Sequence, residues 1–339
     1  MTPRGVLRIA GTGALDGLPD FRPRAPWYGG DLQTLRNQLV APPALPPSHR
    51  ERHVVALSTA PGQTLTVLID RPSRGVRQDP LICLLHGLGG SEESRYILLA
   101  TGALLRRGYA VARLVMRGAG ISANGSRGPT HAGLTADLRD TLAGLAAANG
   151  TRDLHVAGFS LGGHQVLRLA AEGDCPAALK SVISISAPLD LAAAADRIAA
   201  PRNAIYAHSL VRAMRAEARR WLAPDDPVRA RLGQLRSVRA FDGAIVAPAH
   251  GFRDADDYYH RASMQRLSAA IAVPTLVIHA ADDPWIPAEA LRETVWPARG
   301  QALVLETASG GHVGFHADGL DSPWYVAALL WWIDRLGGR

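Results

Sequence analysis

The sequence alternates between short apolar runs and helical patterns over most of its length, and this alternation strongly restricts its fold. Amphipathic patterns typical of helices separate runs rich in Val, Ile, Leu and Ala, which resemble buried parallel strands. Six such runs occur, at residues 80–85, 109–115, 154–157, 180–186, 275–280 and 302–306. This order predicts an α/β fold with a doubly wound, mostly parallel sheet and helices on both of its faces.

Two further segments and one long interval complete the predicted layout. His53–Leu57 and Thr64–Ile69 alternate with period two, which predicts an antiparallel opening pair and about eight strands in all. The predicted α/β core therefore comprises residues 51–189 and 271–339. The interval 190–270 lacks a convincing strand pair. Its apolar residues Tyr206, Leu210, Met214 and Ala218 recur every four positions, so we predict a helical cap there.

The first fifty residues are rich in proline and poor in periodicity. We predict an extended N-terminal arm, residues 1–50, that packs on the body of the protein. Its aromatic residues Phe21, Trp27 and Tyr28 are the expected anchors.

Composition excludes several classes of protein. The chain has 339 residues and a formal charge of +7, but no basic block or basic–aromatic stretch suggests nucleic-acid binding. Two cysteines, Cys83 and Cys175, are too few for a disulfide framework. Neither a signal-peptide pattern nor an apolar stretch of about 18–20 residues occurs, so the expected location is the cytoplasm.

The segment GFSLG at residues 158–162 carries the first candidate for chemistry. A predicted strand precedes it and a predicted helix follows it, which is the setting of a nucleophile elbow. There, flanking glycines permit a tight turn that exposes the serine. We predict Ser160 as a nucleophile; the alternative is a glycine-rich turn with a passive serine.

The glycine-rich loop HGLGG at residues 86–90 also follows a predicted strand. No G-K-[ST] follows, so a phosphate-binding loop is not indicated. We predict that the backbone N–H groups of Leu88 and Leu161 form an oxyanion hole. The side chain of His86 is expected to be structural and to pack under the loop.

An acidic residue and a histidine follow the last two predicted strands. In ADDPWIP, Asp283 is the predicted orienting carboxylate, with Asp282 as the alternative. In SGGHVGF, His312 is the predicted base, and the chain order Ser160, Asp283, His312 is the one that such folds use. His312 and His316 have the i, i+4 spacing of a metal pair, but Gly314 argues against a helix there. No metal site is therefore predicted.

These motifs resemble the YheT-like branch of the α/β-hydrolases, which is related to the abhydrolase-domain lipid esterases. The resemblance extends over most of the chain through LQTL (32–35), HGLGGS (86–91), HAGLTADL (131–138), GFSLGG (158–163), SAPLDL (186–191), FDGAIVAPAHGF (241–252), DYYHRAS (257–263), ADDPWIP (281–287) and GGHVGF (310–315). Two positions depart from the family pattern, Asp31 before LQTL and Val115 before Arg117. Neither is a predicted catalytic position.

The resemblance implies a cofactor-independent carboxylesterase for short- to medium-chain acyl esters, including acylglycerols or other lipids. Two alternatives stay open: acyl transfer by the same three residues, and a non-catalytic binding protein of the same fold. Part of the predicted cap also carries a cluster of eight arginines, at positions 212, 215, 219, 220, 229, 231, 236 and 239. They indicate either a solvated surface or a contact with anionic membranes.

Overall fold

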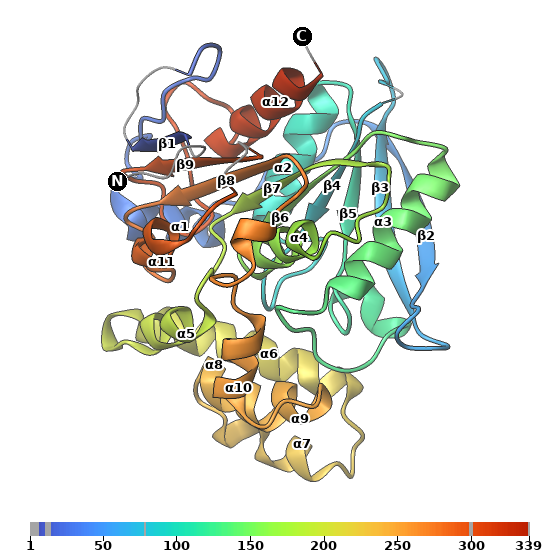
Figure 1. Ribbon diagram of the computed structural model, residues 1–339, viewed down its shortest axis with the longest axis vertical. Helices are drawn as coiled ribbons and strands as arrows, with labels where there is room; N and C mark the ends of the chain where they lie inside the picture. The colour runs from blue at the N-terminus through green and yellow to red at the C-terminus, as the bar shows by residue number, and fades with distance from the viewer. Residues whose placement is uncertain (1–6, 11–14, 78, 298–300, 338–339) are drawn as a thin grey trace.

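The computed structural model describes residues 7–10, 15–77, 79–297 and 301–337, and its described part contains one nine-stranded sheet (Figure 1). The strands lie in the order β1-β9-β8-β7-β6-β4-β5-β3-β2. Strand β3 is antiparallel to β2 and β5, and all other neighbouring pairs are parallel. The bounds are β1 (Leu7–Ala10), β2 (Ser48–Ala56), β3 (Thr64–Pro72), β4 (Leu81–Leu85), β5 (Ala110–Leu114), β6 (Leu154–Phe159), β7 (Leu179–Ile185), β8 (Thr275–Ala280) and β9 (Ala302–Thr307). The predicted fold class and antiparallel opening pair are confirmed, and β1 adds one strand to the expected eight.

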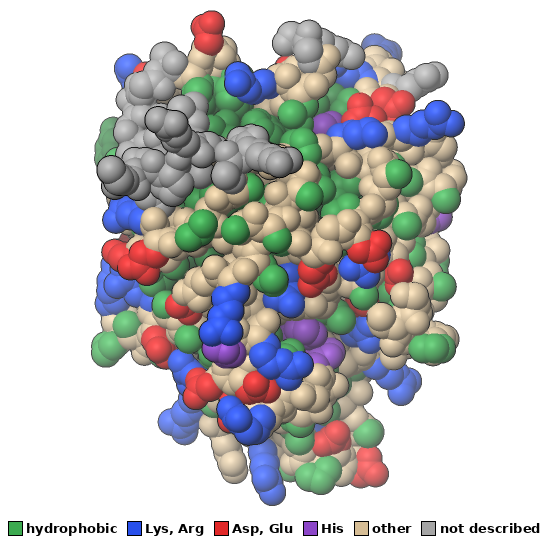
Figure 2. All heavy atoms as spheres, in the orientation of Figure 1, with side chains coloured by type: hydrophobic (Ala, Val, Ile, Leu, Met, Phe, Trp, Pro, Cys, Tyr) green, Lys and Arg blue, Asp and Glu red, His purple; other side chains and the backbone are tan. Residues whose placement is uncertain are grey.

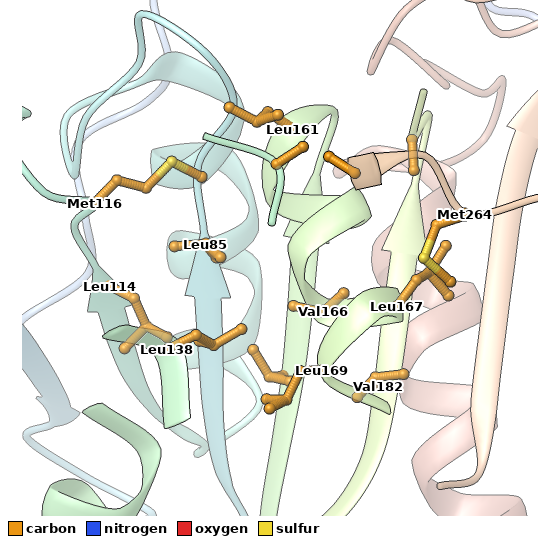
Figure 3. Packing of buried hydrophobic residues seen from close by; sticks show 14 of the residues in the cluster. Leu85, Leu114, Met116, Leu138, Leu161, Val166, Leu167, Leu169, Val182 and Met264 are labelled. Carbon is orange, nitrogen blue, oxygen red and sulfur yellow. The ribbon is translucent and has the colours of Figure 1, made fainter. Parts of the chain in front are cut away.

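The packing of strand β4 explains why all of its residues are apolar. Leu81, Cys83 and Leu85 belong to the core on one face of the sheet, whereas Ile82 and Leu84 belong to the core on the other. Side chains alternate along a strand, so a strand covered on both faces must be apolar at every position. Figure 3 shows Leu85 among the leucines and valines of the first core.

Helices cover both faces of this sheet (Figure 1). Helices α3 and α4 contribute to the core that contains Leu85, and α2 and α12 contribute to the opposite core. The helices outside the interval 190–270 are α1 (Gly29–Leu39), α2 (Arg95–Arg106), α3 (Thr135–Asn149), α4 (Leu161–Glu172), α11 (Ala288–Glu293) and α12 (Trp324–Leu336), with the 3-10 turn η1 (Gly120–Asn124).

Residues 190–270, here called the helical insertion, connect β7 to β8 and gather at one end of the sheet (Figure 1). The predicted amphipathic helix is present as α6, and Met214 and Ala218 are buried on it. The insertion consists of α5 (Leu191–Ala199), η2 (Pro201–Asn203), α6 (Ala204–Trp221), α7 (Pro227–Arg231), η3 (Leu232–Gln234), α8 (Val238–Phe241), the π-helix η4 (Asp242–Val246), α9 (Ala247–Ala249), α10 (Ala255–Ala262) and η5 (Ser268–Ala270).

The N-terminal segment differs from the predicted extended arm. It contains the 11-residue helix α1, and β1 pairs with β9. Phe21 is buried and packs edge-on against Phe315 and Trp324, with ring centroids 5.9 Å away in both cases. Tyr28 is 59% exposed and is not an anchor.

Helix α1 was absent from the sequence prediction. Leu32, Leu35 and Leu39 have helical spacing, but Leu32 and Leu39 are exposed and Leu35 is half-buried, so this stripe is not the face that packs on the protein. The buried residues of the helix are Gln33, Thr34 and Asn37, all polar. Hydrophobic periodicity cannot reveal a helix whose buried face makes hydrogen bonds instead of apolar contacts.

Two further sequence inferences concern the two cysteines and the search for membrane-spanning helices. Cys83 and Cys175 are both free, and Cys83 is fully buried, which raises the pKa of its thiol to about 12. Within the described ranges, no helix has both the length and the apolar character needed to cross a membrane.

Candidate active site

Ser160 occupies the turn between β6 and α4, and its backbone is strained. Its φ is 53° and its ψ is −118°, a conformation that costs residues other than glycine about 1–3 kcal/mol. A Cβ on Gly158 would lie 2.2 Å from the Gly162 carbonyl oxygen, and one on Gly162 would lie 2.4 Å from the His86 oxygen. Only glycine therefore fits on either side. The turn has the geometry of the predicted nucleophile elbow, with Ser160 partly exposed at the carboxyl end of β6.

The glycine-rich loop beside Ser160 is held by a neutral histidine. The His86 ring lies with Nδ1 2.8 Å from the Gly87 oxygen, and the Met116 N–H donates to Nε2 over 3.2 Å. Burial lowers the pKa of His86 to about 4. One ring nitrogen must accept from Met116, so the neutral form with a proton on Nδ1 satisfies both contacts. The structural role expected for His86 agrees with this geometry.

The two predicted oxyanion donors lie beside the serine. The Gly87 N–H donates to the Tyr96 hydroxyl at 2.8 Å and is thereby occupied. The next residue, Leu88, lines a cavity together with Ser160 and Leu161. Leu161 is the first residue of α4, so its N–H has no acceptor within the helix. Their role in binding an oxyanion stays a prediction.

The structure brings His312 into contact with Asp283 and not with Asp282. His312 Nδ1 lies 2.9 Å from Asp283 Oδ2. The other oxygen, Oδ1, accepts from the Trp285 and Ile286 N–H groups at 2.8 and 3.0 Å. Asp282 instead accepts from the Gly311 N–H at 2.9 Å. The contact geometry therefore favours Asp283 over Asp282, and its role as the orienting carboxylate stays a prediction.

The electrostatics of Asp283 keep it ionised. Burial alone would raise the pKa of this carboxyl. The attraction and hydrogen bond of His312, the attraction of His279 and the hydrogen bond from the Trp285 N–H lower it by more. The net shift of the Asp283 pKa is downward. An ionised carboxylate at Nδ1 holds the imidazole in the tautomer whose Nε2 can accept a proton.

Sequence reasoning missed two supports of the histidine. The indole of Trp285 stacks on the His312 ring, with centroids 4.5 Å apart and an interplanar angle of 30°. On the backbone side, the His312 N–H donates to Thr34 Oγ1 at 2.8 Å. Trp285 belongs to ADDPWIP and Thr34 to LQTL, so both lie in motifs that the family resemblance singles out.

Two cavities meet at Ser160. The inner cavity, about 90 Å³, is mostly apolar and is lined by Ser160, Leu88 and Leu161 and by the helical insertion, including Ile198 and Met214. The outer cavity, about 350 Å³, is more polar. It is lined by Ser160 and His312 and by Asn37, Ser94, Arg95 and Tyr206. Among the residues that the structure describes, Ser160 Oγ makes no hydrogen bond.

The inner cavity is also lined by two carboxyl groups that sequence reasoning missed, the buried Asp242 and the half-buried Glu217. Burial raises the pKa of Asp242 to about 7 and that of Glu217 to about 7. The Tyr259 hydroxyl donates to Asp242 Oδ2 at 2.7 Å. This hydrogen bond between Tyr259 and Asp242 joins the segment DYYHRAS to FDGAIVAPAHGF.

His316, which has metal-pair spacing to His312, contacts two residues of helix α1. His316 Nδ1 lies 3.0 Å from an Arg36 Nη atom, and His316 Nε2 lies 3.0 Å from Asn37 Oδ1. Burial, Arg36 and Arg24 lower the pKa of His316 to about 3. No group of three or more potential metal ligands was found in the described part of the chain.

Known proteins were compared with the chain by sequence. Residues 80–318 match the model of the alpha/beta hydrolase fold. YheT of Escherichia coli is 31% identical over 262 residues, which cover 75% of this chain and 76% of YheT. The monoacylglycerol lipase of Saccharomyces cerevisiae is 29% identical over 260 residues, 74% of this chain and 58% of that protein. Phospholipase ABHD3 of Mus musculus is 29% identical over 242 residues, 70% of this chain and 58% of the phospholipase.

Solved structures share the fold. The esterase Pf2001 of Pyrococcus furiosus superposes with a TM-score of 0.58 at 16% identity, covering 88% of this chain and 98% of the esterase. The 2,6-dihydroxy-pseudo-oxynicotine hydrolase gives 0.56 at 21% identity, covering 91% of this chain and 73% of that one. The chain spans little more than half of the yeast and mouse relatives. From the family model and the similarity to YheT, the chain belongs to the YheT-like branch of the α/β-hydrolase family.

Proposed function

We propose that the protein hydrolyses carboxylic esters through an acyl-enzyme formed on Ser160. The observation that carries this proposal is the 2.9 Å contact between His312 and a buried Asp283, in a cavity that Ser160 also lines. Relatives named as a monoacylglycerol lipase and a phospholipase support the same class of reaction.

In the proposed reaction His312 accepts the Ser160 proton at Nε2, and the serine oxygen attacks the ester carbonyl. The Leu88 and Leu161 N–H groups stabilise the oxyanion, each by roughly 3 kcal/mol. His312 then protonates the leaving alcohol, and water repeats the sequence on the acyl-enzyme. The Ser160–His312 hydrogen bond forms in the substrate complex, since catalytic contacts often tighten only there.

The two cavities divide the substrate between them. His312 lines the outer cavity, and the leaving alcohol must receive its proton from His312, so the alcohol part belongs there. The acyl chain then occupies the inner cavity, whose apolar lining favours hydrocarbon. We infer a short- to medium-chain acyl group on a polar alcohol, a class that includes acylglycerols and other lipid esters. The helical insertion acts as the predicted cap.

Fluorophosphonate labelling tests the proposal, followed by p-nitrophenyl esters of graded acyl length. Wild type should be labelled and active, and Ser160→Ala should lose both properties, with a fall in kcat of roughly 10⁶-fold. A folded wild type that neither labels nor hydrolyses any of the esters would favour the binding-protein alternative. Product analysis with added alcohols separates hydrolysis from acyl transfer, because a transferase would yield a new ester.

The eight arginines between positions 212 and 239 of the helical insertion divide into two groups. Arg215, Arg229 and Arg239 bind backbone carbonyls or carboxylates within the insertion. The remaining five are exposed: Arg212, Arg219, Arg220, Arg231 and Arg236. Figure 2 shows basic and acidic side chains both present over this end of the molecule.

We propose peripheral contact of these five exposed arginines with anionic membranes, because exposed cations attract anionic lipid. Liposome sedimentation tests it: binding should rise with anionic lipid content. Equal binding to neutral and anionic vesicles would instead indicate a solvated surface.

A further inference from the structure

The loop that carries His312 has an unfavourable backbone. Val313 and Phe315 have φ values of 59° and 51°, and Gly311 has 60°. Positive φ is uncommon for residues other than glycine, and for a β-branched valine it is an outlier. Such a conformation persists only where surrounding contacts impose it. The position of the His312 ring therefore depends on what holds this loop.

Helix α1 makes those contacts, although it lies some 280 positions earlier in the chain. The His312 N–H donates to Thr34 Oγ1 at 2.8 Å, and Asn37 Nδ2 donates to the Val313 oxygen at 2.7 Å. Gln33 bonds the backbone of His316 twice, accepting from its N–H at 2.7 Å and donating to its oxygen at 3.0 Å.

The helix and the loop also approach backbone to backbone. A Cβ on Gly311 would lie 2.2 Å from the Gly30 oxygen, and one on Gly314 would lie 2.6 Å from the Gln33 oxygen. Glycine at both positions lets the loop lie directly on α1. The Thr34 hydroxyl donates to the Gly30 oxygen at 2.7 Å, so its oxygen is oriented to accept from His312.

These contacts differ from those of a helix that only adds stability. Surface helices normally bury an apolar stripe, whereas α1 buries Gln33, Thr34 and Asn37, with exposed fractions of 0%, 5% and 5%. All three bind the backbone of the histidine loop. Thr34 and Asn37 also line the outer cavity, together with Ser160 and His312.

We propose that Thr34 and Asn37 are positioning residues that set the His312 ring against Ser160. This inference rests on the proposed esterase activity and adds α1 to its apparatus. Thr34 fixes the backbone N–H of His312 itself, and Asn37 fixes the carbonyl of the following residue. Removing either contact lets the strained loop relax and moves Nε2 away from the serine, although substrate still binds. The expected effect is therefore on kcat and not on KM.

The test uses the full chain with Thr34→Val, which keeps the shape of the side chain and removes the acceptor. A fall in kcat of roughly 10²-fold is expected, since displacements of about 1 Å have such effects, with KM changed less than threefold. Thr34→Ser, which restores the acceptor, should recover kcat to within about threefold of wild type. Asn37→Ala should behave like Thr34→Val. Leu39→Ala is the matched control on the same helix, because Leu39 is 66% exposed.

Two further measurements separate a loss of folded protein from a loss of Ser160 reactivity. Thermal unfolding reports how much of each variant is folded, and the rate of fluorophosphonate labelling reports the reactivity of Ser160 in the folded fraction. Slower labelling in folded Thr34→Val, with rescue by Thr34→Ser, supports positioning. Unchanged labelling per folded molecule, or a Thr34→Ser variant as slow as Thr34→Val, overturns it. A wild type that does not label at all would contradict the esterase proposal instead.

Discussion

The nucleophile elbow and the histidine loop meet at the same cavity but are built differently. The elbow, residues 158–163, depends on close neighbours: a Cβ on Gly158 would strike the Gly162 oxygen. The loop at residues 310–316 depends on α1, through contacts such as Thr34 to His312, 278 positions apart. Both contain residues with positive φ.

The two regions should therefore differ in how much stability and how much activity a substitution removes. The elbow lies among buried central strands, so disturbing it should cost stability and activity together. The histidine loop lies against a polar helix near the edge of the structure, so disturbing it should cost activity with less stability. Four predictions test this contrast, in order of decreasing effect.

The largest effect should come from the carboxylate that orients the histidine. Asp283→Asn keeps the size of the side chain but removes the charge at His312 Nδ1, and we expect kcat to fall by roughly 10⁴-fold. Asp282→Asn is the matched control, since Asp282 contacts the Gly311 N–H and not the His312 ring. Steady-state ester hydrolysis measures both. Equal losses in the two variants would contradict the assignment of Asp283.

Two glycine substitutions compare the regions directly. In Gly162→Ala the new Cβ would lie 2.4 Å from the His86 oxygen and 2.6 Å from the Leu85 oxygen, both on rigid backbone. We expect a loss of about 3 kcal/mol in the free energy of unfolding, as overpacking costs in a tight core. In Gly311→Ala the new Cβ would lie 2.2 Å from the Gly30 oxygen, at a residue whose φ is 60°. Because Gly30 belongs to a partly exposed helix and not to the central strands, we expect a fall in kcat with a smaller loss of stability than in Gly162→Ala.

Urea unfolding and ester hydrolysis measure this pair of variants. Gly233→Ala is the control, since a Cβ there would meet nothing within 4 Å. The contrast between the regions fails if Gly311→Ala destabilises the protein as much as Gly162→Ala does.

A smaller effect is expected from the aromatic support of the histidine. Trp285→Leu removes the ring stacked 4.5 Å from His312, and such contacts contribute about 0.5–1.5 kcal/mol. We expect kcat to fall by about tenfold, which corresponds to about 1.4 kcal/mol. Trp285→Phe should retain most of the activity. Trp285→Leu with the kcat of wild type would show that Asp283 and α1 suffice to hold the ring.

The effect that is smallest near neutral pH is that of acidification, and it grows as the pH falls. Burial lowers the pKa of His86, beside the elbow, to about 4, and burial with Arg36 and Arg24 lowers that of His316, on the histidine loop, to about 3. Both pKa values in the folded protein lie below the ordinary value of 6.5. At a pH between the folded value and 6.5, the unfolded chain therefore binds more protons than the folded protein does. The stability that these two histidines contribute is therefore fully present above about pH 6.5 and falls toward pH 4, by at most about 1.4 kcal/mol per pH unit per histidine.

Urea unfolding of His86→Asn and His316→Asn between pH 7 and pH 4 tests this prediction. Each variant lacks one titrating group, so the free energy of unfolding should depend less steeply on pH than in wild type. A slope that matches wild type in both variants would place the acid sensitivity elsewhere.

Much of the fold could be predicted from sequence because its signals are local. Strand β4 reads as apolar at every position, since both of its faces are covered. The turn at Ser160 can be recognised in the sequence from Gly158 and Gly162, because a side chain at either position would collide with backbone atoms. The order of Ser160, Asp283 and His312 follows the order of the strands that carry them.

Other parts could not be predicted because their partners are distant in the chain. The choice of Asp283 over Asp282 depends on which carboxylate meets His312. Burial of Asp242 in the inner cavity depends on how α6, α8 and α10 pack together.

The sequence by itself determined the layered α/β architecture and the residues that can carry the chemistry, because hydrophobic periodicity and glycine turns act over a few neighbouring positions. Only the tertiary structure decided how the histidine is held. Helix α1 buries Gln33, Thr34 and Asn37 and not its leucines, and each of these polar side chains bonds a backbone group of the loop that carries His312. Hydrogen bonds between segments some 280 residues apart leave no local pattern, so their pairing exists only in the folded chain.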